Sequence, residues 1–274
     1  MKINTNIVSM QTQNFLRKNN MGLENAMNRL SSGKRINSAA DDAAGLAIAS
    51  RMQTKITGMD VGVRNSNDGI SLMQTAESAL GSITNILQRM RDLAVQSANG
   101  TYNSTDRASL NDEYSQLTAE INHIATNTTF NGVPLLQDDT VQIPIQLSDV
   151  AGDVMSIQLI NAQSTNLNGG SGLTTDILDT TNAGLALDSL DTAITEIADR
   201  RAAFGATLNR LQFNIENLNS SSTNLSAAKS RIEDADMSRE VSEMTKNKVL
   251  VQSGVAMLSQ ANQNPQMITQ LLQN

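Results

Sequence analysis

The 274-residue chain is 39% hydrophobic but only 2% aromatic, so its core has to be built from aliphatic side chains, which suits packing between helices. It has no cysteine, which excludes disulfides, thiolate nucleophiles and cysteine-ligated zinc, and it has one histidine, His123. The net charge of −7 is concentrated in residues 108–199, which hold 13 acidic and no basic side chains; phosphates would be repelled there, so nucleic acid is not expected as a partner.

The first 30 residues predict a helix with one apolar face. Leu16, Leu23 and Leu30 are seven residues apart, and Ile3 and Ile7 precede them. The start of the sequence lacks the continuous apolar run of a signal peptide, and no stretch of 18 residues is apolar enough to span a membrane. We therefore expect no cleaved signal and no membrane as partner.

A long helix is predicted over about residues 41–98. Ser38–Asp41 resembles a capping box, and Asn99-Gly100 is a stop signal. Apolar residues between them alternate at spacings of four and three, interrupted at Ser66, and this pattern places one stripe against a partner helix. The stripe consists of Met52, Ile56, Met59, Val63, Ile70, Met73, Ala76, Leu80, Ile83, Leu87, Met90 and Ala94.

Two further helices carry the same spacing. One starts at Thr105 or Asp106, and the other is centred on residues 190–218. Between them, residues 131–183 change character: a turn at 131–137 leads into a short strand, and residues 141–147 and 154–160 are expected to pair as a hairpin. Joints are expected at 219–223 and 233–240, with Ser238 capping the last helix.

The C-terminal stretch 249–274 contains no charged residue but has a recurrent apolar face. Full burial of its ten large apolar side chains would contribute roughly 1.5–3 kcal/mol each. Ordering its backbone costs about 1–2 kcal/mol per residue. The balance favours a helix that becomes ordered when protein surrounds it on several sides.

These observations predict a mainly α fold: a long antiparallel helical bundle, or coiled-coil rod, formed by paired N- and C-terminal arms with a small β-rich central insert. Residues 1–40 and 235–274 are expected to form an inner terminal coiled-coil domain. Residues 41–130 and 184–234 are expected to form the long-helix bundle. Residues 131–183 form a short, acidic, surface-exposed segment.

Long strings at both ends resemble bacterial flagellin. They include "RLSSGKRINSAADDAAGLAIASRM", "LQRMRDLAVQSANGT" and "FNGVPLL" near the N-terminus and "RIEDADMSREVSEMTKNKVLVQSGVAMLSQANQNPQ" near the C-terminus. Together the matches cover about residues 1–137 and 185–274. The middle shows no such match.

The resemblance implies a non-enzymatic structural subunit without a cofactor or metal, which polymerises into the extracellular filament used for swimming. It implies export in an unfolded state by the flagellar type III apparatus, an export chaperone on the C-terminal segment, and hook-associated and cap proteins as partners. It also implies that the terminal segments line the inner tube of the polymer. The corresponding positions are Ile3, Ile7, Leu16, Leu23, Leu30, Val251, Val255, Leu258, Ile268, Leu271 and Leu272.

In many flagellins the stretch matching Leu87–Leu93 is a surface for an innate immune receptor of the Toll-like class. Arg89, Leu93 and Glu113 occupy the matching positions here, and Asp92 stands where enteric members often have Glu. The alternative is that Arg89 and Glu113 are packing-face charges between subunits. Glycosylation stays unassigned, because loops are rich in Ser and Thr in any case.

Three other interpretations remain. The hook–filament junction protein of the same family has similar terminal helices. A signalling coiled coil would need an anchor or a recruitment module. An enzyme would have to use His123 with Glu120 or Glu113, and a lone histidine on the flank of a helix is more often solvated or packed than catalytic.

Overall fold

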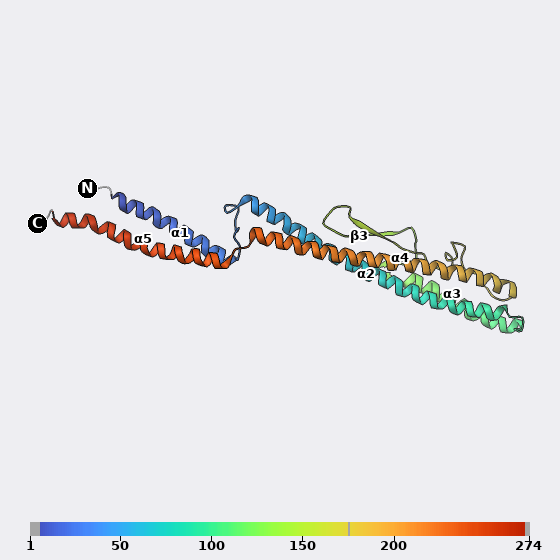
Figure 1. Ribbon diagram of the computed structural model, residues 1–274. Helices are drawn as coiled ribbons and strands as arrows, with labels where there is room; N and C mark the ends of the chain where they lie inside the picture. Colours follow the sequence, from blue (N-terminus) through green and yellow to red (C-terminus); the bar gives the residue numbers. More distant parts are fainter. Residues whose placement is uncertain (1–5, 175, 272–274) are drawn as a thin grey trace. The chain divides into compact units, whose positions relative to one another are not determined.

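The computed structural model describes residues 6–174 and 176–271, with side chains described as far as residue 263. Long helices account for most of it, and short strands lie between α3 and α4 (Figure 1). This confirms the predicted mainly α fold with helical arms and a small β insert. The elements are α1 (Ile7–Ser32), α2 (Ala43–Ala98), α3 (Ser104–Asn127), β1 (Thr129–Phe130), β2 (Val133–Pro134), β3 (Gln142–Gln146), β4 (Val154–Gln158), α4 (Thr180–Glu233) and α5 (Met237–Leu271).

The chain divides into two compact units. The terminal unit comprises Met1–Ile56 and Thr223–Asn274, and the central unit comprises Thr57–Ser222. α2 and α4 therefore each contribute one end to the terminal unit and the remainder to the central unit. The three domains expected from the sequence have their boundaries elsewhere, after residues 40, 130, 183 and 234. That three-part division remains a prediction.

In the terminal unit, α1 and α5 pack side by side in antiparallel directions (Figure 1). Near the start of α1, the Asn6 side chain donates to the carbonyl oxygen of Ala261 at 2.9 Å. Gly254 lies against Leu16, where a Cβ atom would come within 3.0 Å of the leucine side chain. The missing side chain at Gly254 thus lets the two helices approach closely at this position.

Two helix starts differ from expectation. Ser38–Asp41 forms a separate turn, in which the Asp41 carboxylate accepts from the backbone and hydroxyl of Ser38. The cap of α2 is Asp42, whose side chain accepts from the backbone N–H of Gly45 at 2.9 Å. At α5 the cap is Asp236 and not Ser238, since its carboxylate accepts from the N–H groups of residues 238 and 239.

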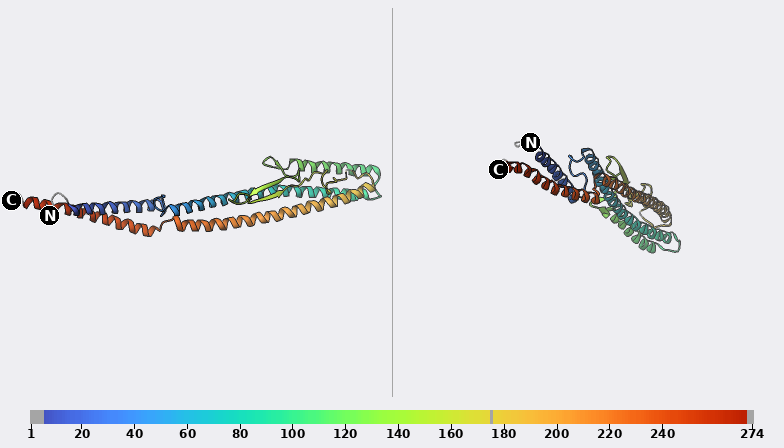
Figure 2. Two further views of the ribbon diagram at one scale, coloured as in Figure 1. Left: turned by 90° about the horizontal axis from the view of Figure 1, so that it is seen from above. Right: turned by 60° about the vertical axis from the view of Figure 1, so that its left-hand side comes forward.

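In the central unit, α2, α3 and α4 lie side by side around one aliphatic core (Figure 2). The predicted stripe of α2 faces this core from Ile70 onward, with Met73, Leu80, Ile83 and Leu87 almost fully buried. Its first residues, Met52, Met59 and Val63, are only half-buried and lie outside this core. Ser66 is also buried, and its hydroxyl donates to the carbonyl oxygen of Gly62 at 2.8 Å. The single polar residue in the stripe therefore has a hydrogen-bonding partner within its own helix.

The β-rich insert follows the predicted pattern. β1 and β2 form a tight hairpin, and both turn residues, Asn131 and Gly132, have positive φ angles of 49° and 80°. β3 and β4 pair in an antiparallel register that places Ile143 opposite Ile157. The predicted joint at 219–223 is wrong, because α4 continues through it as regular helix to Glu233.

Candidate functional site

The most unusual surface of the terminal unit is the apolar one on α1 and α5. Large apolar side chains of both helices are exposed to solvent, although the two helices already pack on one another. An exposed apolar area of this extent marks an interaction surface. On α1 these residues are Ile7, Val8, Met10, Phe15, Met21 and Met27, and on α5 they are Met237, Val241, Val249, Leu250, Val255 and Met257.

The positions expected inside the polymer divide into two groups. Leu16, Leu23, Leu30, Val251 and Leu258 are half-buried, whereas Ile7 and Val255 are exposed. Ile3 and Leu272 lie outside the described residues, and so do the side chains of Ile268 and Leu271. The half-buried side chains are partly covered within the single chain. The exposed side chains leave apolar surface that a neighbouring subunit would cover. Their role in a polymer remains a prediction.

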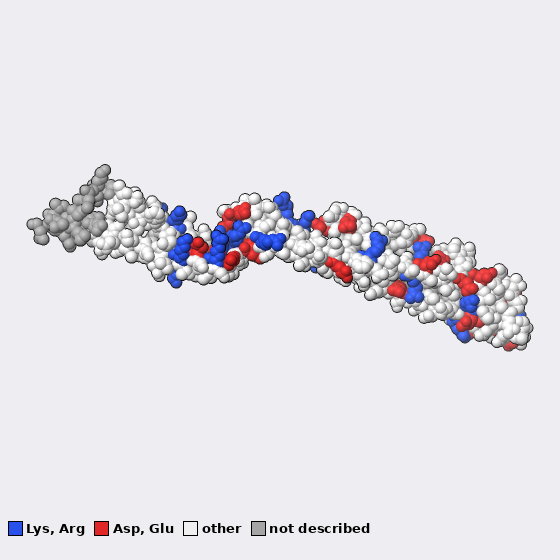
Figure 3. Space-filling model, in the orientation of Figure 1, with Lys and Arg blue, Asp and Glu red and all other residues white. Residues whose placement is uncertain are grey.

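The part of this surface formed by the start of α1 and the end of α5 carries no charge, whereas Met21, Met27, Met237 and Val241 lie among charged residues. No charged residue occurs in α1 before Arg17 or in α5 after Lys248 (Figure 3). Charged side chains gather instead toward the ends of α1 and α4 and the start of α5. Covering the uncharged segment with protein therefore requires no desolvation of an ionised group.

The second candidate surface lies on α2 and α3 in the central unit. Arg89 and Glu113 are both exposed, and their side chains form an ion pair at 2.7 Å. Leu93, the third residue of the predicted receptor surface, is only 1% exposed and belongs to the core. The structure thus brings Arg89 and Glu113 together on the surface but does not present Leu93 there.

No constellation suited to catalysis appears among the described residues. His123 lies 3.8 Å from Glu120, and both side chains are largely exposed. Within the described ranges, no group of three histidine or acidic side chains could hold a metal ion. In that same part of the chain, no helix is long and apolar enough to cross a membrane.

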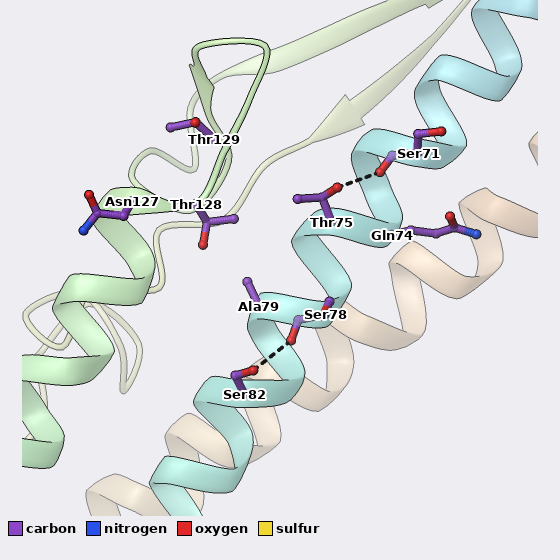
Figure 4. A pocket seen from close by; sticks show the side chains of 9 residues that line it. All are labelled: Ser71, Gln74, Thr75, Ser78, Ala79, Ser82, Asn127, Thr128 and Thr129. Carbon is purple, nitrogen blue, oxygen red and sulfur yellow. Dashed lines mark hydrogen bonds between the residues drawn. The ribbon is translucent and has the colours of Figure 1, made fainter.

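A groove of about 730 Å³ lies between α2 and the end of α3 (Figure 4). Uncharged residues line it, mostly serine and threonine. Four of the hydroxyls, those of Ser71, Thr75, Ser82 and Thr128, donate to the carbonyl oxygen four residues earlier, in α2 or α3. The groove therefore offers no acid, base or charged group for chemistry.

Sequence reasoning did not identify a charged cluster where the connectors following α1 and α4 meet. Glu233 there accepts from Lys34 at 2.6 Å and from Lys229 at 3.4 Å. The spacing of Lys229 and Glu233, i to i+4 near the end of a helix, is a usable signal for one of these contacts. The contact with Lys34 joins residues far apart in the sequence, and no local pattern indicates it.

Comparison with known proteins gives consistent results. The family model of the bacterial flagellin N-terminal helical region matches residues 3–140, and that of the C-terminal helical region matches residues 187–272. Flagellin of Listeria monocytogenes is 47% identical over 285 residues, which cover 99% of each chain. Flagellin of Halalkalibacterium halodurans is 44% identical over 272 residues, covering 99% of this chain and all of the relative.

A solved structure shows the same relationship. The crystal structure of Bacillus cereus flagellin matches with a TM-score of 0.51 and 48% identity, and it covers 61% of this chain and 94% of that one. With both family models matched and near full-length identity above 40%, the chain belongs to the bacterial flagellin family and is a structural subunit of the flagellar filament.

Proposed function

We propose that copies of this chain polymerise into the filament through the apolar surface of α1 and α5, which become enclosed in the interior of the polymer. The observation that supports this most directly is the set of large apolar side chains exposed on both helices. Covering the exposed half of each of these side chains would contribute on the order of 1 kcal/mol to the free energy of association. Repetition of that contribution along two helices and over several neighbours favours assembly over a single docked partner.

The three-part division expected from the sequence fits this role. Residues 1–40 with 235–274 would form the innermost layer, and residues 41–130 with 184–234 a layer of long helices around it. Residues 131–183 would face the outside, where the acidic side chains of this segment remain hydrated. Membership of the family is the support for this arrangement.

The same proposal places the subunit outside the cell after export in an unfolded state by the flagellar type III apparatus. A chaperone would hold the C-terminal segment before export, and hook-associated and cap proteins would contact the ends of the filament. The exposed apolar side chains of α5, including Val249 and Met257, are a reason why a free subunit needs such a cover.

The alternative within the family is the hook–filament junction protein. The two roles differ in one measurable property: a filament subunit elongates filament seeds, whereas purified protein that cannot elongate them would favour the junction role. Electron microscopy of seeded, purified protein distinguishes them, and long tubes of uniform width are the outcome expected here.

A matched pair of substitutions tests which surface drives assembly. Val8 on α1 and Val150 in the loop between β3 and β4 have the same exposure, 60% each. Val8→Asp would place a carboxylate in the enclosed interior, where an unpaired charge is strongly unfavourable, while Val150→Asp would leave it hydrated. We expect Val8→Asp to abolish sedimentation of seeded polymer and Val150→Asp to leave it unchanged.

Circular dichroism of the soluble variants is the control for folding. Equal sedimentation of the two variants would contradict an interior position for α1. Loss of sedimentation in Val150→Asp alone would indicate that the assembly surface lies on the β insert and not on α1.

A further inference from the structure

Three Asn-Gly pairs occur in the chain, all of them in the central unit. Asn99-Gly100 lies in the turn between α2 and α3 (Figure 1), Asn131-Gly132 in the β1–β2 hairpin, and Asn168-Gly169 in the loop before α4. An Asn-Gly pair is chemically reactive, because glycine has no side chain to obstruct the attack of its nitrogen on the asparagine amide. Each pair is therefore a candidate for deamidation, the conversion of asparagine to aspartate or isoaspartate.

Deamidation needs only the chain and water. The glycine nitrogen forms a bond to Cγ of the asparagine while the bond from Cγ to Nδ2 breaks, and ammonia leaves with the proton that the glycine nitrogen has given up. Water then opens the succinimide ring that remains. Breaking the bond from Cγ to the glycine nitrogen gives aspartate, and breaking the bond from the backbone carbonyl carbon gives isoaspartate. The first step requires a nitrogen that can approach Cγ, and a donor to Oδ1 stabilises the oxyanion that forms.

The backbone conformation separates Asn99 from the other two asparagines. Asn131 and Asn168 have positive φ angles of 49° and 64°, which place them in the left-handed region. In that region the nitrogen of the next residue is anti to Cβ about the Cα–C bond, so the side chain points away from the atom that must attack it. Asn99 does not have a positive φ.

Hydrogen bonding favours Asn99 as well. Its Oδ1 accepts from the backbone N–H of Thr101 at 3.1 Å, which folds the side chain over the Gly100 peptide. The same bond polarises the amide and would stabilise the oxyanion formed on attack. Within the described part of the chain, the N–H of Gly100 donates to no acceptor, so it is free to lose its proton. Asn99 and Gly100 are both exposed, and water can reach them.

At Asn168 both reacting groups are held. The N–H of Gly169 donates to the Glu196 carboxylate at 3.3 Å, and Nδ2 of Asn168 donates to the carbonyl of Gly172 at 3.3 Å. Attack at this site would have to break both bonds. Asn131 is exposed, so only its left-handed backbone opposes the reaction.

From these differences we propose that Asn99-Gly100 is a self-modification site, at which the folded chain converts its own asparagine to aspartate or isoaspartate. Asn131-Gly132 reacts more slowly, and Asn168-Gly169 is the slowest. Isoaspartate would insert one carbon into the turn between α2 and α3, where the Arg107 guanidinium donates to the carbonyls of Ser97 and Asn99 at 3.0 and 3.2 Å. The proposal concerns the central unit alone and does not depend on polymerisation or on the terminal helices.

Peptide mass spectrometry of the purified, unassembled chain measures each site separately during incubation in neutral buffer. Water labelled with heavy oxygen marks the ring-opening step and so distinguishes new modification from any present beforehand. We expect Asn99 to be modified about tenfold faster than Asn131, because a hydrogen bond to a charged group contributes enough for about one factor of ten in rate. In urea the three sites should react at similar rates, since the folded backbone no longer distinguishes them.

Gly100→Ala is the variant that tests the attacking nitrogen. A Cβ there meets nothing within 4 Å, so the fold accommodates it, but the methyl group hinders the approach to Cγ. We expect it to slow modification of Asn99 by about tenfold and to leave Asn131 unchanged. Gly205→Ala, where a Cβ also meets nothing within 4 Å, is the matched control and should leave all three rates unchanged.

Three results would overturn the proposal. One is equal rates at the three sites of the folded chain. Another is an Asn99 that stays unmodified in the folded chain while it reacts in urea. The third is an unchanged rate at Asn99 in Gly100→Ala. None of these measurements requires a polymer, so a failure of assembly would leave them intact.

Discussion

The Cα of Gly62 on α2 lies so close to the carbonyl oxygen of Leu147 that a Cβ atom at this position would overlap that oxygen. The contact continues along the same helix. A Cβ at Gly58 would lie 2.5 Å from the Cβ of Asp149, and Asn65 donates to the carbonyl of Gln146 at 3.1 Å. The β3–β4 hairpin is thus seated directly on the backbone of α2, and glycine is what allows this approach.

Gly62→Ala should therefore destabilise the central unit by about 1–3 kcal/mol, since the obstacle is backbone rather than a flexible side chain. Gly81→Ala in the same helix is the control, because a Cβ there meets nothing within 4 Å. The control should instead stabilise the protein by up to about 1 kcal/mol through better helix propensity. Urea denaturation of both variants measures the difference. Equal shifts would show that the hairpin can move away at little cost.

The fold was largely predictable from the sequence because its elements depend on local patterns. The four-three spacing of α2 predicted which side chains face the core, and the alternation in residues 141–147 and 154–160 predicted the hairpin. Helix starts were less certain, as Asp42 and Asp236 show. In each case an acidic residue near the expected cap makes the bonds: Asp42 lies four residues after Ser38, and Asp236 lies two residues before Ser238. Residue type alone does not choose between such neighbouring candidates.

Contacts between distant segments could not be predicted in the same way. The ion pair between Lys34 and Glu233 joins residues far apart in the sequence. So does the close contact between Gly62 and the carbonyl oxygen of Leu147. The spacing of Gly58, Gly62 and Gly69 on one helix face was a signal for a close approach, but it did not indicate which segment approaches. The exposure of the apolar residues on α1 likewise depends on how much of α1 is covered by α5, which is distant in the sequence.

Tyr114 gives a prediction about alkaline pH. Its side chain is fully buried and its hydroxyl donates to the carbonyl of Thr174 at 3.0 Å; burial raises its pKa from 10.0 to about 12. Between these values the unfolded chain has lost the phenol proton while the folded chain still holds it. The unfolded state then binds fewer protons, and stability falls as the pH rises through this window.

The expected loss from this group is about 2–3 kcal/mol by the top of the window. Urea denaturation at about pH 9 and about pH 12 measures it, and the Tyr114→Phe variant should lack this component of the decline. The chain has only two tyrosines. In Tyr102→Phe, ultraviolet absorbance therefore reports Tyr114 alone. Titration of that variant near the ordinary tyrosine value would show that the phenol is accessible to water and contradict the prediction.

Arg89 and Leu93 allow receptor recognition to be separated from folding. Arg89 pairs with Glu113 on the surface, and both side chains are at least 44% exposed, so Arg89→Ala should cost less than about 1 kcal/mol of stability. Leu93 is buried, and Leu93→Ala should cost about 2–5 kcal/mol. Thermal unfolding of the two variants checks this contrast directly.

If Toll-like receptor recognition uses this surface, Arg89→Ala should abolish receptor activation in a reporter-cell assay while its melting temperature stays near that of the parent. Glu113→Gln should weaken activation as well, because it removes the charge that orients the Arg89 guanidinium. Arg64→Ala, which changes an exposed arginine elsewhere on α2, is the matched control and should activate normally. Full activation by Arg89→Ala would contradict the receptor role, and the Arg89–Glu113 ion pair would then be only a contact between α2 and α3. Loss of activation confined to Leu93→Ala would attribute the effect to a damaged core, because that side chain can reach a receptor only if the core opens.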